Sequence, residues 1–116
     1  MQTVLAVRVA RGPAEQQAAI DAWLSEQRSA DAGSRHAIIA EGAFFDLVVP
    51  PEVPIERLAA GCVCCIGLLP MQVTLTRLLR AFRPQSLLLL IADAQHLGRV
   101  RAMVAEGKLG VVLEES

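Results

Sequence analysis

The feature that most constrains the fold is an uninterrupted aliphatic run late in the chain, Leu87–Ala92. It has the length of one strand, and a strand without polar alternation is typical of one buried on both faces of a parallel sheet. Parallel strands need long crossover connections, which are usually helices. The run therefore predicts an α/β domain in which strands and helices alternate along the chain.

The rest of the sequence fits this alternation. Aliphatic and β-branched segments predict strands at Thr3–Ala10, His36–Glu41, Ile55–Leu58 and Gly110–Leu113. Helices are expected from Pro13 to the loop Ser29–Ser34, from Leu68 to Arg83-Pro84, and from Leu97 to a cap at Gly107. The three prolines of 50–54 predict an irregular segment. We expect one domain spanning residues 1–116, a three-layer α/β/α arrangement with a mostly parallel sheet of about 4–5 strands.

Apolar spacing identifies the expected inward faces of the helices. The inward residues are Ile20, Trp23 and Leu24 in the first helix, Leu68, Met71, Leu75, Leu78, Leu79 and Phe82 in the second, and Leu97, Val100, Met103 and Val104 in the third.

The charge balance excludes some classes of partner. Eleven basic and twelve acidic residues give a net charge of −1, and aromatic residues make up only 3% of the chain. Nucleic-acid binders usually have a basic excess and stacking aromatics, so we expect no nucleic-acid partner. No apolar run approaches the roughly 20 residues of a membrane span. The first residues do not resemble a signal peptide, because Arg8 interrupts their apolar run, and we expect a cytoplasmic protein without a membrane partner.

All three cysteines lie in one short stretch, Gly61–Gly67, as Cys62, Cys64 and Cys65. The flanking glycines allow the backbone to bend so that neighbouring thiols converge, and a helix beginning beyond them favours thiolates. Three thiolates suit zinc or another transition metal, with a fourth ligand from elsewhere. Two alternatives remain open: Cys62 and Cys65 have the spacing of a redox pair, and buried thiols can be inert.

Two further residues are candidates for the same chemistry. Asp93 follows the aliphatic run, at the end of the strand where ligands gather in open α/β sheets, and His96 comes three residues later. His96 is a candidate fourth ligand, and the alternative is a solvated histidine at the start of a helix. Asp93 is a candidate metal ligand, and capping of the following turn explains it equally well. His36, at the start of a strand, is expected to be structural.

The Gly-Cys-x-Cys-Cys motif, placed between a strand–turn–helix unit and a helix followed by an aliphatic strand, resembles the CobW-like metallochaperone P-loop GTPases. The resemblance covers roughly Thr3 to Val100, and the motif is its specific part. It implies a P-loop-NTPase-like sheet and a metal bound through Cys62, Cys64 and Cys65. It places a Walker-B-like role at Asp93. Family members continue into a guanine-recognition motif and a further domain, so this chain would be a truncated member.

The phosphate-binding loop departs from the family pattern. Val9–Gln17 falls on Gly-x-x-Gly-x-Gly-Lys-Thr-Thr, where Gly12 matches but Glu15 takes the lysine position and Gln16 that of the magnesium-binding threonine. A carboxylate repels phosphate, and Pro13 lacks one of the backbone amides that would bind it. We therefore expect GTP hydrolysis and Mg²⁺-nucleotide binding to be lost, with Gly12 as a remnant.

The sequence thus predicts a degenerate CobW-like domain that binds a transition metal and acts as a small carrier or interaction subunit, with a metalloprotein client and self-association as candidate partnerships. Three other functions remain open: a nucleotide-binding GTPase with an atypical loop, a thiol redox module, and a structural interaction domain.

Overall fold

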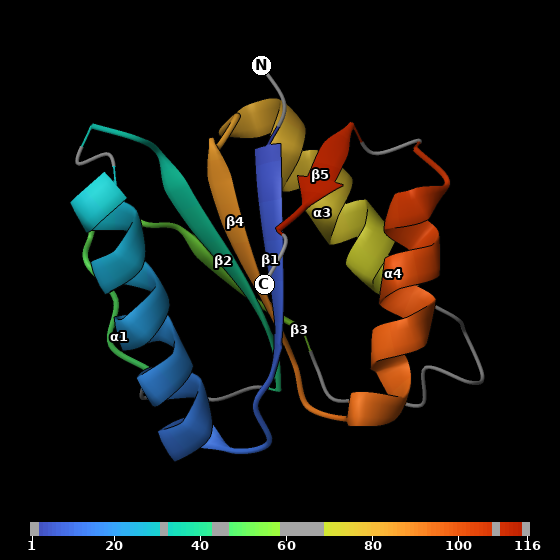
Figure 1. Cartoon of the computed structure of the whole chain (residues 1–116), viewed down its shortest axis with the longest axis horizontal. Helices are drawn as coiled ribbons and strands as arrows, with labels where there is room; N and C mark the ends of the chain where they lie inside the picture. Colours follow the sequence, from blue (N-terminus) through green and yellow to red (C-terminus); the bar gives the residue numbers. More distant parts are fainter. Residues whose placement is uncertain (1–2, 31–32, 43–46, 59–68, 108–109, 115–116) are drawn as a thin grey trace.

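The protein is a three-layer sandwich with a central parallel sheet (Figure 1). The computed structural model describes residues 3–30, 33–42, 47–58, 69–107 and 110–114. The described strands are β1 (Thr3–Val9), β2 (His36–Glu41), β3 (Ile55–Leu58), β4 (Ser86–Ile91) and β5 (Val111–Leu113). The described helices are α1 (Pro13–Ala30), α3 (Leu69–Ala81), the 3-10 turn η1 (Ala94–His96) and α4 (Leu97–Ala105). The predicted α/β/α fold is confirmed.

The sheet has the strand order β3-β2-β4-β1-β5, and all of its pairings are parallel. The strand β4 lies at its centre, between β2 and β1, and Leu87–Ile91 have no exposed surface. The aliphatic run therefore has the position that its composition predicts. Strands β1 and β2 flank it in register, with Val4 and His36 both opposite Ser86.

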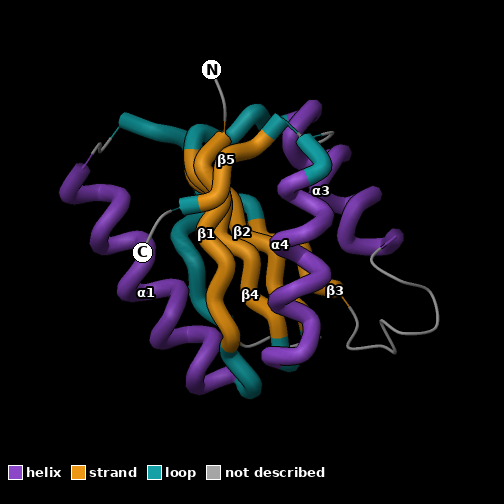
Figure 2. The backbone as a smooth tube through the Cα atoms, turned by 45° about the vertical axis from the view of Figure 1, so that its right-hand side comes forward, coloured by secondary structure: helices purple, strands orange, loops and turns teal. Residues whose placement is uncertain are grey.

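Alternate residues of the strands face two separate cores, because side chains along a strand point to opposite faces. Leu87, Leu89 and Ile91 pack with residues of α3 and α4, whereas Leu88 and Leu90 pack with α1 and the segment 47–53. Figures 1 and 2 show the result, with α1 on one face of the sheet and α3 and α4 on the other.

The predicted inward faces of the helices are confirmed for the residues that the structure describes. Ile20, Trp23, Leu24, Met71, Leu75, Leu78, Val100, Met103 and Val104 are buried, and Leu79, Phe82 and Leu97 are partly buried against the core. Leu68 lies outside the described residues. The Trp23 ring meets His36 edge-on at 5.7 Å, which places this histidine in the core packing under α1.

The helix ends follow their local chemistry. Pro13 begins α1, where its missing N–H removes no helical hydrogen bond. After α4, Gly107 adopts φ +77° and its N–H donates to Val104 O at 3.0 Å, which confirms the predicted glycine cap. The first helix extends to Ala30, so the loop after it begins later than Ser29. Among the described helices, none is long and apolar enough to cross a membrane.

Candidate functional site

Of the predicted site residues, Gly12, Asp93 and His96 are described, and they follow the carboxyl ends of β1 and β4. With the end of β2, which lies between β3 and β4, these strand ends form one edge of the sheet, called here the carboxyl edge. Between β1 and α1 the connection is Ala10-Arg11-Gly12, and η1 begins shortly after β4. In open α/β sheets, this edge is where ligands bind.

Gln16, in the first turns of α1, contacts the ends of β1 and β2 at this edge. It follows Pro13 by three residues, and its side chain is wholly buried. Its Nε2 donates to Glu41 O at 2.8 Å and lies 3.4 Å from Ala10 O, so one amide links α1 to the ends of β1 and β2. Its Oε1 is buried and has no hydrogen-bond partner among the described residues. Gln16 therefore has a structural role, because its amide joins α1 to the ends of β1 and β2.

Glu41 is the last residue of β2, and its side chain contacts the segment that follows β4. Its side chain is 5% exposed, and Oε1 accepts a hydrogen bond from Ala92 N at 2.7 Å. The same oxygen lies 3.3 Å from His96 Nδ1. A carboxylate oxygen only accepts hydrogen bonds, so this contact favours the proton on Nδ1 and leaves Nε2 with its lone pair in the neutral ring. In that tautomer the Nε2 lone pair of His96 is the one not engaged by Glu41.

Asp93 and His96 lie in one turn, but their side chains have different partners. The Asp93 carboxylate accepts from Gln95 N at 2.9 Å and caps η1, and its carbonyl accepts from His96 N at 3.0 Å. Asp93 is exposed, whereas the His96 side chain is 15% exposed and turned toward Glu41. The hydrogen bond from Gln95 N therefore supports the interpretation of Asp93 as a turn cap.

The beginning of α1 differs from a phosphate-binding loop in its backbone. Only three residues separate β1 from α1, so Val9 is still in the strand and Pro13 is already in the helix. A Cβ added to Gly12 would meet nothing within 4 Å, so packing does not require glycine there. Glu15 is exposed in the first turn, where the helix dipole favours a carboxylate.

Cys62, Cys64 and Cys65 lie outside the described residues, in the connection between the end of β3 at Leu58 and the start of α3 at Leu69. Over the part of the chain that the structure describes, no three His, Cys, Asp or Glu side chains come together in a way that could hold a metal ion.

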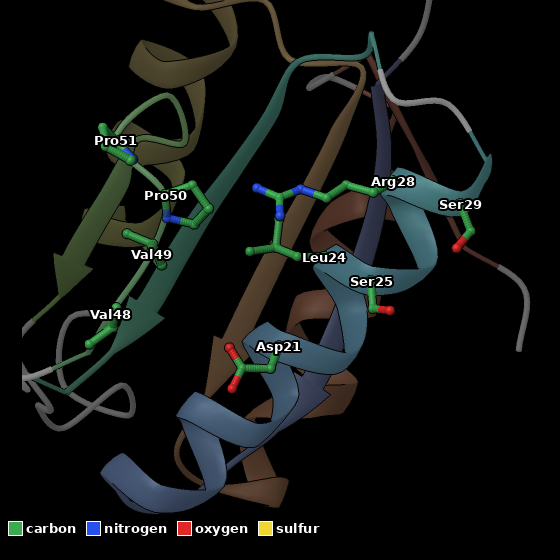
Figure 3. A pocket seen from close by; sticks show the side chains of 9 residues that line it. All are labelled: Asp21, Leu24, Ser25, Arg28, Ser29, Val48, Val49, Pro50 and Pro51. Atoms are coloured by element: carbon green, nitrogen blue, oxygen red, sulfur yellow. The ribbon is translucent and has the colours of Figure 1, made fainter.

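A separate groove of about 740 Å³ runs between α1 and the segment 48–51 (Figure 3). Leu24, Ser25 and Arg28 of α1 form one wall, and Val48, Val49, Pro50 and Pro51 form the other. Gln17 joins the two walls, since its Oε1 accepts from Val48 N at 2.7 Å and its Nε2 donates to Val48 O at 2.9 Å. Among the predicted site residues that the structure describes, none lines this groove.

Sequence reasoning did not assign the roles of Gln16 and Glu41. The signal for Gln16 was present, because it precedes Ile20 by four positions and Trp23 by seven, and therefore lies on the buried face of the helix. Glu41 carried no such signal, because its partners Ala92 and His96 are distant in the sequence.

Comparisons with protein-family models, curated proteins and solved structures find no match for this chain.

Proposed function

We propose that this chain binds a transition metal, zinc foremost, through Cys62, Cys64 and Cys65, and that it acts as a small metal carrier or interaction subunit of the cytoplasm. The observation that carries the proposal is the placement of all three cysteines within four consecutive positions of one inter-element connection. Three thiolates in one short segment supply most of a tetrahedral zinc site. In a reducing compartment such thiols stay available to a metal.

The pairing of β2 with β3 supports the proposal that a residue of the carboxyl edge is the fourth metal ligand. Leu58, the last described residue before the cysteines, is opposite Glu41 in the sheet, and Gly42 N donates to Leu58 O at 2.6 Å. Cys62 follows Leu58 by four positions in the sequence. The last described residue before the cysteines is therefore at the same edge of the sheet as Glu41.

His96 is our choice for the fourth ligand. Metal-binding histidines usually donate their other ring N–H to a carboxylate, which fixes the tautomer and the ring orientation. The 3.3 Å contact between Glu41 and His96 Nδ1 has this form and leaves Nε2 for the metal. A Cys₃His set is a common tetrahedral zinc environment, and the metal would be cargo to be passed to a metalloprotein client.

We further propose that the domain works without GTP. The three-residue β1–α1 connection, Pro13 at the first helical position and the buried Gln16 tie all support this. A phosphate-binding loop needs a longer glycine-rich segment with free amides, a lysine and a hydroxyl.

The test is metal binding by the purified, fully reduced protein. Titration with Co²⁺ should produce the intense visible d–d bands of a tetrahedral site and the charge-transfer bands of thiolate ligands, with about one ion per chain. Zinc should displace the cobalt, and Cys64→Ser should abolish the thiolate spectrum. Wild-type protein that retains no metal above background, with all thiols reduced, overturns the proposal.

Two matched variants test the fourth ligand. His96→Ala should weaken zinc binding by about 10- to 100-fold and alter the cobalt d–d bands, whereas Asp93→Asn, three residues away, should leave both unchanged. Equal behaviour of the two variants would exclude His96 as a ligand while leaving the cysteine site intact.

The proposal that the domain works without GTP is tested on wild type and on a variant with the lysine and threonine of the P-loop pattern. Calorimetric titration of wild type with GTP and Mg²⁺ should give a flat trace. Glu15→Lys/Gln16→Thr should also fail to bind, because the two substitutions do not lengthen the β1–α1 connection. Measurable GTP binding by wild type would favour the atypical GTPase over the carrier.

A further inference from the structure

The two helical layers of the protein carry opposite charge. The helices on one face of the sheet, α3 and α4, contain no acidic residue, and their charged residues are Arg77, Arg80, Arg99 and Arg101. On the opposite face, α1 carries Glu15, Asp21 and Glu26 against Arg28. All of these side chains are exposed. Surface helices ordinarily intersperse the two signs, so this separation of charge across the sheet is a specific feature of the chain.

The arginines are concentrated on the outer side of their layer. Val73, Arg77 and Arg80 are spaced four and three residues apart and therefore share one exposed stripe of α3, with Val73 56% exposed. The described ion pairs include Arg77 with Glu56 at 3.2 Å, and none of them engages Arg80, Arg99 or Arg101. Their guanidinium groups are thus available to carboxylates, which they can bind through two hydrogen bonds each.

We infer that a second copy of this chain is the partner of this surface: the α3–α4 face of one copy packs against the α1 face of the next. The complementary charges are both on the same molecule: α3 and α4 carry +4, of which Arg77 is already paired with Glu56, and α1 carries −2. The net charge of −1 means that little overall repulsion opposes the approach of two copies. Val73 on one face and Val48, 74% exposed beside α1, add apolar area to the contact.

The geometry determines the kind of assembly. The two faces lie on opposite sides of the sheet, so a contact between them is heterologous and leaves one free face at each end (Figure 2). Such a contact does not close as a two-fold dimer does, so the assembly grows with concentration. The inference concerns the helical layers alone and does not depend on metal binding.

The test uses two neutralised variants, each of which removes one half of the contact. Arg80→Gln/Arg99→Gln/Arg101→Gln neutralises the basic face, and Glu15→Gln/Asp21→Asn/Glu26→Gln neutralises the acidic face. In sedimentation velocity at low ionic strength, the weight-average mass of wild type should rise steadily with concentration, and added salt should reverse the rise. Each variant alone should remain monomeric.

An equal mixture of the two variants is the decisive sample. It contains one intact basic face and one intact acidic face, so it should form a 1:1 dimer that cannot grow further. Arg11→Gln, a neutralisation in the β1–α1 connection outside both layers, should associate like wild type. Far-ultraviolet circular dichroism and melting curves that match wild type establish that the variants are folded.

Two results would overturn the inference: a wild type that is monomeric at every concentration at low ionic strength, or a mixture no heavier than its separate components. If the monomeric wild type binds oligo-glutamate through the same three arginines, the basic face belongs to an acidic partner of another kind.

Discussion

The buried amide of Gln16 offers the sharpest test of how the carboxyl edge is built. Gln16→Glu keeps the shape of the side chain but replaces Nε2 with an oxygen facing Glu41 O and Ala10 O, which the nitrogen now meets at 2.8 and 3.4 Å. An uncompensated buried charge costs about 3–5 kcal/mol. Protonating the introduced carboxyl at pH 7 is the alternative, and from an ordinary pKa near 4.3 it costs about 3.7 kcal/mol. We therefore expect unfolding free energy to fall by about 3–4 kcal/mol.

Gln16→Met is the matched control, because it has similar length and no polar atom. It loses the two hydrogen bonds of Nε2, at about 1 kcal/mol each, but it also removes Oε1, whose burial without a partner costs about 1–3 kcal/mol. These effects nearly cancel. We expect the methionine variant to lie within about 1 kcal/mol of wild type, so the difference between the two variants isolates the charge.

The assay is urea unfolding followed by the fluorescence of Trp23, the only tryptophan, which is buried beneath α1. Burial raises the folded-state pKa of the introduced carboxyl, so its penalty grows as the pH rises above the unfolded value and levels off above the folded one. The difference between the glutamate and methionine variants should therefore shrink toward pH 4. Equal unfolding free energies of the glutamate and methionine variants at pH 7 would refute the buried position of the Gln16 amide.

Three further substitutions test the rest of the framework. Glu41→Ala should cost about 1–3 kcal/mol because the Ala92 N–H loses its acceptor, whereas Glu41→Gln, which keeps an oxygen, should cost less; equal losses in urea unfolding would contradict the assigned bond. Arg35→Ala should lower the melting temperature and cost about 1–2 kcal/mol, since Arg35 donates to Phe82 O at 3.0 Å beyond the end of α3 and lies over the Phe82 ring. Leu89→Ala, wholly buried in β4, should cost about 3–5 kcal/mol by chemical denaturation, and a loss below about 1 kcal/mol would exclude its central position.

Most of the fold could be predicted because its signals are local. The aliphatic run of β4 and the helix periodicities depend on residues within a few positions of one another, and the observed strand β2 coincides with the predicted His36–Glu41. The order of strands was not predicted. It depends on which strands the crossovers bring together, as when β4 enters between β2 and β1, and no residue of the separate segments specifies that choice.

The candidate site was predictable only in part, for the same reason. The cysteine motif is a local pattern, and it named the proposed metal ligands. The pair formed by Glu41 and His96 joins residues 55 positions apart, and the ring contact exists because β2 and β4 are adjacent in the sheet. The sequence left Asp93 as either a metal ligand or a turn cap and made His96 a candidate fourth ligand, and the turn geometry now shows Asp93 as the cap and His96 beside Glu41.

Hydrogen bonds among its own residues hold the carboxyl edge together. The Gln16 amide binds the carbonyl of Glu41, and the Glu41 carboxylate binds Ala92 N and contacts His96, so one residue connects α1, β2 and the turn after β4. These contacts supply the hydrogen bonds that fix the strand ends at this edge. The same contacts orient His96 Nε2 away from Glu41. In the function proposed above, Gln16 stabilises this edge without a bound ligand, and His96 is the ligand that the edge supplies to the metal.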